Sequence, residues 1–300
     1  VSAAILMRID KGWLYRGYLL YLFPFGLMLF WNRAEPHLIM IVSLSLLLSK
    51  HYTESRYLPI LMGFLGGAVS ALKMHGAVYI FAAYLAITAS NFSISSVLLF
   101  IISTLLSFLA FFIPHSVSFS GFWGYLKLAG FEHGLSLRLW VESLIYLLFL
   151  LFPFIILKRG MSIEKPTMIR LALILFIEFL ITIVASKHGN GFYHLLPLIP
   201  VNAFIIQKLS ETVNVEGILI KILYVSLIAV SLIVVLKDLI FPMAKSWRRF
   251  DYAQKELVYF EKRYPDIMMG VTDEQGYPYS FLRAIMKKRQ IDYASFMDLQ

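Results

Sequence analysis

Long runs of apolar residues, broken by short polar segments, occupy most of the first 236 residues of the chain. Nine runs are long enough to cross, or nearly cross, a hydrocarbon layer about 30 Å thick. They cover residues 17–30, 38–49, 57–72, 77–89, 97–113, 139–157, 171–185, 195–206 and 218–236. The pattern predicts an α-helical polytopic membrane protein with about nine transmembrane helices. Several runs fall short of the roughly 20 residues of an ideal span, which fits helices that line a water-filled recess.

The pattern changes after residue 236. Residues 246–263 combine many charges with apolar side chains at helical spacing, which predicts an amphipathic helix. Residues 266–271 and 291–297 read as strands, and residues 279–289 between them read as a helix. We therefore divide the chain into a transmembrane domain, residues 1–240, and the start of a small C-terminal α/β domain, residues 241–300. A disordered basic tail is the alternative, and the regular apolar spacing argues against it.

Composition supports a membrane protein and excludes several other classes. Hydrophobic residues make up 59% of the chain and charged residues only 15%, whereas soluble domains average about 25% charged residues. Since there is no cysteine, disulfides, zinc-thiolate sites and iron–sulfur clusters are excluded. No Walker loop, GxSxG elbow, HExxH or GxGxxG pattern occurs, and no aspartate lies between Asp10 and Asp238. ATPase, serine hydrolase and zincin functions thus lack support.

Lysine and arginine predict which loops face the cytoplasm. One set of alternate loops carries eleven of these residues, Arg170 and Lys208 among them, and the remaining eleven of the 27 lie in the tail. The other set carries five: Arg33, Lys73, Lys127, Arg138 and Lys187. Because basic residues favour cytoplasmic loops, the first set is placed inside. The short outer loops and the α/β tail are then extracytoplasmic. The first two apolar runs also fit a re-entrant hairpin, which would remove two crossings and leave this sidedness unchanged.

Both chain ends predict that the sequence is a fragment. Val1 opens inside an apolar run that extends to Met7, without a preceding start or signal segment. Residues 291–297 form a predicted strand that is followed by only three residues, Asp298 to Gln300, and no terminating turn. Any functional group outside this window cannot be found within it.

Three polar clusters lie at predicted outer ends of the apolar runs, where six of the seven histidines also fall. Interfacial anchoring and snorkelling explain part of this distribution. The clusters nevertheless hold more cations and histidines than anchoring needs, so we take them as candidate substrate-binding residues. They are Arg33 and Glu35; Lys73 and His75; and Lys187, His188, Tyr193 and His194.

Two glutamates within apolar runs have different expected roles. Glu178 lies in the middle of residues 171–185, where a carboxyl group is costly and marks a partnered or functional position. Glu142 lies one turn after Arg138, so we interpret it as part of a structural ion pair.

The order of the outer motifs resembles the GT-C superfamily of polytopic glycosyltransferases, which use polyprenyl-phosphate-linked sugars. Protein O-mannosyltransferases and bacterial lipid A aminoarabinose transferases belong to this superfamily. The resemblance rests on an Arg-x-Glu-Pro turn at Arg33, a glycine-rich helix that leads to Lys73, and Tyr193-His-Leu-Leu-Pro-Leu-Ile-Pro. The tail, with Tyr264-Pro265-Asp266 near its start, is similar to that of bacterial members.

The resemblance implies transfer of a sugar from a polyprenyl-phosphate donor to a hydroxyl on a lipid, glycan or protein acceptor, in a bacterial plasma membrane. Lys73 and Arg33 would stabilise the leaving phosphate, with His188 and Lys187 next, while Tyr193 and His194 would contact the phosphate or the sugar. The family's catalytic Asp or Glu in the first outer loop has no counterpart, so we assign no general base.

Other expectations remain open at this point. A divalent metal is possible through His75 or Glu35, and no nucleic-acid partner is expected. A secondary transporter or lipid flippase is the main alternative function, favoured by Glu178 and the short helices. A noncatalytic membrane scaffold is the third, and it leaves the outer cations unexplained.

Overall fold

The computed structural model describes most of the first 211 residues and parts of the remainder. The described ranges are 8–10, 12–19, 21–22, 34–52, 55–88, 93–114, 118–132, 134–157, 165–187, 191–211, 250–263, 269–271 and 293–295, with isolated positions at 5 and between 222 and 244. The chain divides into two compact units, Val1–Val230 and Ser231–Gln300. Each unit is considered by itself. The predicted domain boundary after residue 240 stays a prediction.

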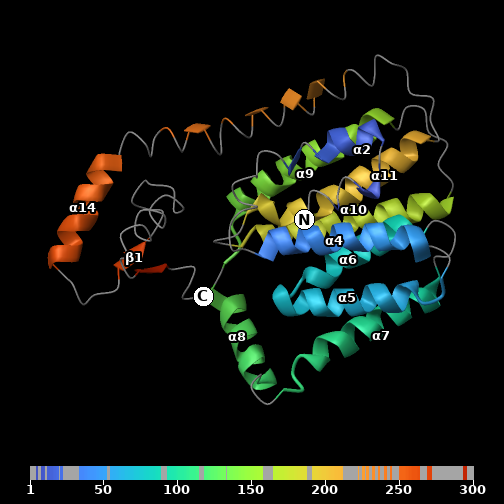
Figure 1. Ribbon diagram of the computed structural model, residues 1–300, viewed down its shortest axis with the longest axis horizontal. Helices are drawn as coiled ribbons and strands as arrows, with labels where there is room; N and C mark the ends of the chain where they lie inside the picture. The colour runs from blue at the N-terminus through green and yellow to red at the C-terminus, as the bar shows by residue number, and fades with distance from the viewer. Residues whose placement is uncertain are drawn as a thin grey trace. The chain divides into compact units, whose positions relative to one another are not determined.

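The regular elements described in the first unit are all helices (Figure 1). Seven of the nine predicted apolar runs form helices there, while most of 17–30 and 218–236 lies outside the described residues. The elements are α2 (Trp13–Tyr18), α4 (Ala34–Tyr52), α5 (Leu58–Leu72), α6 (Gly76–Ile87), α7 (Ile94–Ala110), α8 (Phe119–Glu132), α9 (Leu137–Leu157), α10 (Lys165–Ala185), the 3₁₀-helix η3 (Phe192–Leu198) and α11 (Ile199–Glu211).

Three helical segments are long and apolar enough to cross a bilayer. They are Leu137–Ile155, Lys165–Ala185 and Phe192–Glu211. Ala34–Leu48, Leu58–Leu72, Gly76–Ile87 and Ile94–Ala110 are apolar but shorter. Length and composition therefore indicate a membrane protein, while nine crossings remain a prediction.

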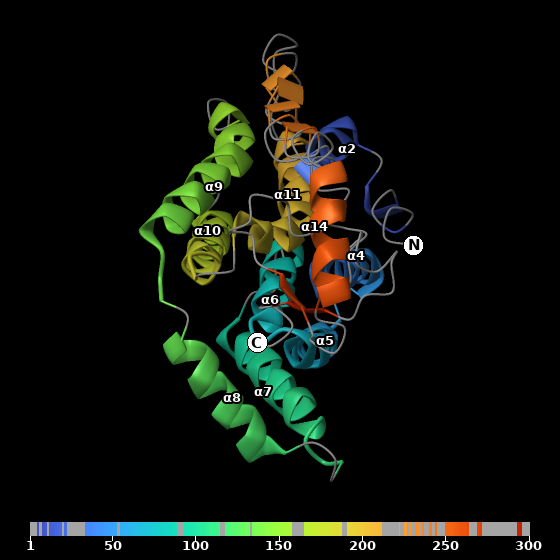
Figure 2. The ribbon, with the colours of Figure 1, turned by 90° about the vertical axis from the view of Figure 1, so that its left-hand side faces the viewer.

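Helix α6 lies in the middle of this bundle (Figure 2). It contacts α4, α5, α10, α11 and η3. Its sequence suits that position, because small and large apolar side chains alternate around the helix and Tyr79, Ile80, Ala82 and Ala83 are buried. Helix α6, which begins directly after His75, is thus held in place by helices on several sides.

A glycine face joins α5 to α7. A Cβ atom at Gly63 would lie 2.4 Å from the Phe100 carbonyl oxygen, and one at Gly67 would lie 2.4 Å from the Thr104 carbonyl oxygen. The Ser107 hydroxyl donates a hydrogen bond to the Phe64 carbonyl at 2.8 Å across the same interface. Only glycine permits the two backbones to approach this closely, so the contact fixes the position of α5 against α7.

Two tyrosines from the N-terminal segment bind the backbone of α9 close to Pro153. Proline has no N–H, so the Phe149 carbonyl four residues earlier loses its helical donor. The Tyr21 hydroxyl donates to that carbonyl at 2.9 Å, and the Tyr18 hydroxyl donates to the Leu150 carbonyl at 2.8 Å. Residues far apart in the chain therefore complete the hydrogen bonding of α9.

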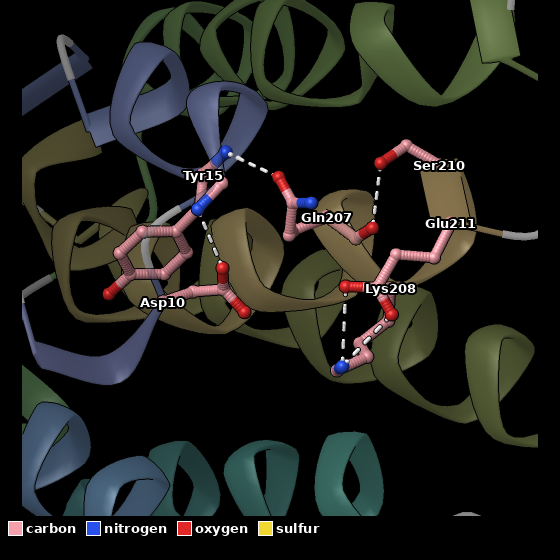
Figure 3. Close-up of polar contacts among 7 residues, drawn as sticks. Asp10, Tyr15, Gln207, Lys208, Ser210 and Glu211 are labelled. Atoms are coloured by element: carbon pink, nitrogen blue, oxygen red, sulfur yellow. Dashed lines mark hydrogen bonds and ion pairs between the residues drawn. The ribbon is translucent and has the colours of Figure 1, made fainter.

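Helix α2 is tied to the last turns of α11 (Figure 3). The Tyr15 amide donates to Gln207 Oε1 at 3.3 Å, while Asp10 accepts the Gly12 amide at 2.7 Å. A Cβ atom at Gly12 would lie 2.1 Å from Gln207 Cδ, so glycine lets the two segments approach. Beyond this contact, Lys208 pairs with Glu211 at 3.0 Å.

Arg170 joins the start of α10 to the end of α6. Its guanidinium donates to the Thr88 carbonyl, to the Pro166 carbonyl at 3.3 Å and to Thr167 Oγ1 at 2.9 Å. Thr88 is the residue at which α6 ends. A cation with several fixed donors satisfies the exposed carbonyls of a helix C-terminus, so Arg170 acts as a cap in trans.

The second unit contains α14 (Phe250–Arg263) and two short strands, β1 (Met269–Val271) and β2 (Tyr293–Ser295). These elements fall within the predicted amphipathic helix and the two predicted strands. The strands pair in parallel, with Met269 opposite Tyr293. Parallel neighbours need a crossover connection, and the helix predicted there, residues 279–289, lies outside the described residues. A complete α/β domain stays a prediction.

Candidate functional site

Five predicted site residues come together at one end of the first unit. They are Glu35, Lys73, His75, Tyr193 and His194. Each lies at the start or end of an element: the first turn of α4, the end of α5, the start of α6, or η3. Arg33 and His188 lie outside the described residues. The structure thus brings residues from four segments into one cluster, here called the outer-end cluster because these segments are predicted to end on the outer face.

Lys73 and Glu35 form an ion pair in this cluster. The Lys73 amide closes α5 by donating to the Val69 carbonyl at 3.0 Å, and its backbone is extended, which turns the side chain away from the helix axis. The Lys73 side chain is 20% exposed and that of Glu35 is 7% exposed. The carboxylate thus lies deeper, and the ammonium lies nearer the surface, where a ligand has access to it.

His75 and His194 contact each other through their ring nitrogens. Nε2 of His75 lies 3.2 Å from Nδ1 of His194, and the ring centroids are 5.2 Å apart. The Tyr79 hydroxyl holds the backbone of this pair by donating to the His194 carbonyl at 2.7 Å. Gly76 makes the turn between α5 and α6 possible, because a Cβ atom there would lie 2.6 Å from the Val69 carbonyl oxygen.

The His75 ring is neutral. Burial lowers the pKa of His75 to about 3, and the positive charges of Lys73 and Lys187 lower it further in the same direction. A neutral imidazole has one donor and one acceptor nitrogen, so one ring donates to the other in this pair. His75 therefore adds no positive charge to the cluster.

Tyr193 contacts Lys73 and His194 within the cluster, and Lys187 lies close enough to act on His75. The Lys73 ammonium lies 5.7 Å from the centre of the Tyr193 ring, which is a favourable position for a cation. Tyr193 also stacks on His194, with centroids 4.7 Å apart and ring planes 26° apart. The backbone at Lys187 pairs with Leu135 in an isolated antiparallel bridge, which holds the segment after α10 against the start of α9.

One of the two glutamates within apolar runs has the role expected for it. Arg138 Nε donates to Glu142 Oε1 at 3.0 Å, which confirms the structural ion pair. Glu178 is 1% exposed and lies outside the outer-end cluster, on the buried side of α10. Two polar contacts were not foreseen: the Tyr79 hydroxyl bond and the Arg170 cap. No local sequence signal marks either one, because each partner lies 82 or more residues away.

A divalent metal does not fit the described part of the cluster. Among the described residues, no three His, Asp or Glu side chains gather as a metal site. Nε2 of His75 faces His194, and Glu35 is paired with the Lys73 ammonium, which would repel a cation. We derive no step that uses a metal.

No protein-family model, curated protein or solved structure matches the chain. The resemblance to GT-C glycosyltransferases therefore rests on the residues of the chain alone.

Proposed function

We propose that the protein is a membrane glycosyltransferase that moves a sugar from a polyprenyl-phosphate donor to a hydroxyl group. The observation that carries the proposal is the outer-end cluster, in which a lysine, a histidine pair and a tyrosine meet at one end of an apolar helical unit. A polyprenyl-phosphate has the matching form, because its chain belongs in hydrocarbon and its phosphate at the edge of it.

Lys73 is the residue that would hold the phosphate. A phosphate that leaves the anomeric carbon gains charge, and a fixed cation in a poorly solvated place stabilises that charge. Glu35, the more deeply buried partner, keeps the Lys73 ammonium in position. With Glu35 negative, Lys73 and Lys187 positive and His75 neutral, these four groups carry a net charge of +1, which still favours an anion.

The other hydrogen-bonding groups of the cluster would orient the bound substrate. The His75–His194 pair and the Tyr193 hydroxyl are able to donate hydrogen bonds to a phosphate or to sugar hydroxyls. Arg33 and His188 would join this set. None of the residues present is assigned as the general base.

The proposed orientation places the outer-end cluster and the α/β tail outside the cytoplasm, in a bacterial plasma membrane crossed by about nine helices. It is supported by the positions of the basic residues assigned to the inside. Arg170 is at the start of α10 and Lys208 is in the last turn of α11, whereas the cluster involves the end of the segment after α10 and the start of η3. The two groups of cations thus belong to opposite helix ends.

A secondary transporter or lipid flippase is the second candidate function. Glu178 favours it, because a carboxyl group buried within an apolar helix is a feature of substrate and ion pathways. A transporter would use a position deep in the unit, and a transferase would use the outer-end cluster.

Binding of polyprenyl phosphate to the full-length protein in lipid nanodiscs tests the proposal. Lys73→Met should weaken binding about 10- to 100-fold, since one charge-assisted contact is lost. Native mass spectrometry or a fluorescent polyprenyl phosphate would report the affinity.

Arg138→Met is the matched control. Arg138 is a predicted outer cation of equal charge, is 87% exposed and is paired within its own helix. It should leave the affinity unchanged. Equal affinities for Lys73→Met and the wild type would show that Lys73 does not bind the phosphate. The transferase would then no longer be the preferred function.

A further inference from the structure

Helix α8 runs across one end of the first unit. Figure 1 shows α4 and α5 along the length of the bundle and α8 crossing that direction, and Figure 2 looks at this end and shows α8 lengthwise. After α8, the Leu135 backbone pairs with that of Lys187, in the segment that leads from α10 to η3. Because η3 contains Tyr193 and His194, α8 lies at the end of the unit that carries the outer-end cluster.

Aromatic rings attach the start of α8 to the end of α7. Phe112, in the turn after α7, lies 5.1 Å from Phe119 and 5.3 Å from Phe122, measured between ring centroids. Phe108 of α7 itself lies 5.6 Å from Phe122. These contacts hold the first turn of α8 against α7, so the chain turns there from the direction of the bundle.

One side of α8 is exposed and combines apolar with basic side chains. Phe119, Trp123 and Lys127 follow each other at intervals of four residues, so they lie along one side of the helix. Phe119 is 51% exposed and Trp123 is 52% exposed. Lys127 is exposed as well, and its ammonium lies 6.0 Å from the centre of the Trp123 ring. Exposed tryptophan and lysine together are typical of the boundary between hydrocarbon and lipid headgroups.

The apolar surface of α7 leads up to this side of α8. Leu105, Leu109 and Ile113 are 54%, 49% and 77% exposed. They lie on the side of α7 opposite Ser103 and Ser107, through which α7 packs on α5. The first unit has the helices of a membrane protein, so lipid is the solvent for such an outward surface. Lipid that covers α7 therefore extends to the start of α8.

We propose that α8 is an interfacial helix that lies flat in the lipid headgroup layer, with Phe119 and Trp123 against the acyl chains and Lys127 at the lipid phosphates. A helix in this layer needs an apolar side and a cation at its polar border, and α8 has both. Its direction across the bundle and its continuity with the apolar surface of α7 favour a bilayer over a protein partner.

The proposal has a consequence for the outer-end cluster. A helix that lies in the headgroup layer marks the level of the bilayer surface, and α8 marks it at the end of the unit where Lys73 is found. A lipid phosphate would then be at the depth of α8 when it approaches that end. This placement does not depend on sugar transfer, so it is tested without an activity assay.

Spin labels on α8 in the full-length protein test the proposal in lipid nanodiscs. Since the 300 residues contain no cysteine, a nitroxide on Trp123→Cys marks one position among them, and the unsubstituted protein gives the background. Oxygen concentrates in hydrocarbon, whereas a nickel chelate stays in water. The ratio of oxygen to nickel collisions should be several-fold higher at Trp123→Cys than for a label in water. Phe119→Cys should give the same result.

Gly124→Cys is the matched control on the same helix. Helical geometry places Gly124 beyond Lys127, on the polar side, and a Cβ atom there has nothing within 4 Å. Its label should collide more with nickel than with oxygen. The contrast between neighbouring positions 123 and 124 separates a helix that lies flat from one that is immersed in hydrocarbon or surrounded by water.

Lys127→Glu tests the contact with the headgroups. The change replaces attraction to anionic lipids with repulsion. In phosphatidylglycerol nanodiscs it should lower the oxygen-to-nickel ratio of the Phe119→Cys label, and in phosphatidylcholine nanodiscs the ratio should change less. An unchanged ratio in phosphatidylglycerol would contradict the position of Lys127 at the phosphates.

Each other outcome at Trp123→Cys and Phe119→Cys overturns the interfacial helix. Frequent nickel collisions at both labels would show that this side of α8 faces water. Rare collisions with both reagents would show that protein covers it, either a second copy of the chain or the C-terminal unit. If one of the two variants does not fold, the other label gives the same measurement.

Discussion

Two helix ends carry cations that make different kinds of contact. Arg170 donates hydrogen bonds from its guanidinium to two carbonyls and a hydroxyl of the protein, and these contacts join α6 to α10. Lys73 instead has a charged partner, Glu35, and lies against the Tyr193 ring beside the His75–His194 pair.

The difference shows how to separate a structural cation from a functional one. Replacing protein hydrogen bonds at Arg170 would leave helix-end carbonyls without donors. A phosphate that binds Lys73 would share its ammonium with Glu35, and the Lys73 side chain is already partly exposed. Stability should therefore depend on Arg170, and ligand binding should depend on Lys73. Each variant below either breaks or sharpens this contrast.

Arg170→Met should have the largest effect on stability. Removal of the guanidinium leaves the buried Thr88 carbonyl unsatisfied and detaches the end of α6, at a cost of about 3 kcal/mol. Thermal or denaturant unfolding in detergent would measure the loss. Lys208→Met removes an exposed cation with a partner in its own helix and should cost less than about 0.5 kcal/mol. If Arg170→Met were as stable as the wild type, the contrast between Arg170 and Lys73 would not hold.

Gly67→Ala should cost about 2 kcal/mol, because the new methyl group would lie 2.4 Å from the Thr104 carbonyl oxygen and 2.6 Å from Ser107 Cβ. It should also weaken binding of polyprenyl phosphate, since α5 would shift and move Lys73 with it. Gly124→Ala in α8 is the control, because a Cβ atom there has nothing within 4 Å. If Gly67→Ala left unfolding unchanged, the close α5–α7 contact would be absent in solution.

Glu35→Gln should change stability by about 1 kcal/mol, because the Lys73 ion pair is partly buried. It removes a negative charge next to the proposed phosphate position, so the affinity for polyprenyl phosphate should rise. Titration of the two proteins with the same lipid gives the comparison. A weaker affinity in Glu35→Gln would show that the carboxylate positions Lys73 more than it repels the phosphate.

His75→Gln should have the smallest effect, and only in acid. The unfolded histidine has a pKa near 6.5, whereas the pKa in the folded protein is about 3. The unfolded state therefore binds more protons between these values, and the contribution of His75 is present above pH 6.5 and lost as the pH falls toward 3. Near pH 5.5 the wild type should lose about 1 kcal/mol relative to His75→Gln, as measured by unfolding at each pH. Parallel pH profiles would mean that the ring is solvated.

The sequence predicted the helical, membrane-bound nature of the first unit because apolar runs respond to a single physical constraint, the hydrocarbon layer. It also predicted that Glu35, Lys73, His75, Tyr193 and His194 belong together, since sidedness alone places their helix ends on one face. Which of these residues pair with one another could not be predicted from the sequence. Whether Glu35 meets Arg33 or Lys73 depends on how α4 packs on α5 and α6, which no local pattern specifies.

Helix α8 and Arg170 show the other limit. Residues 119–132 contain Gly121, Gly124 and Gly130, which weaken a helical pattern, and their helix is supported by ring contacts of Phe119 and Phe122 with α7 and the turn after it. Arg170 was counted only as a cytoplasmic charge. In both cases the stabilising partner comes from another segment, so the tertiary contact decides and the local sequence does not.

The tyrosine bonds to α9 bear on how the protein is made. Tyr21 and Tyr18 reach carbonyls that lie 128 and 132 residues later in the chain. During synthesis, α9 enters the bilayer with the Phe149 carbonyl still lacking the donor that Pro153 cannot provide. The earlier segment must therefore already be in place to receive it. Insertion of α9 is thus expected to depend on a part of the chain that left the ribosome long before.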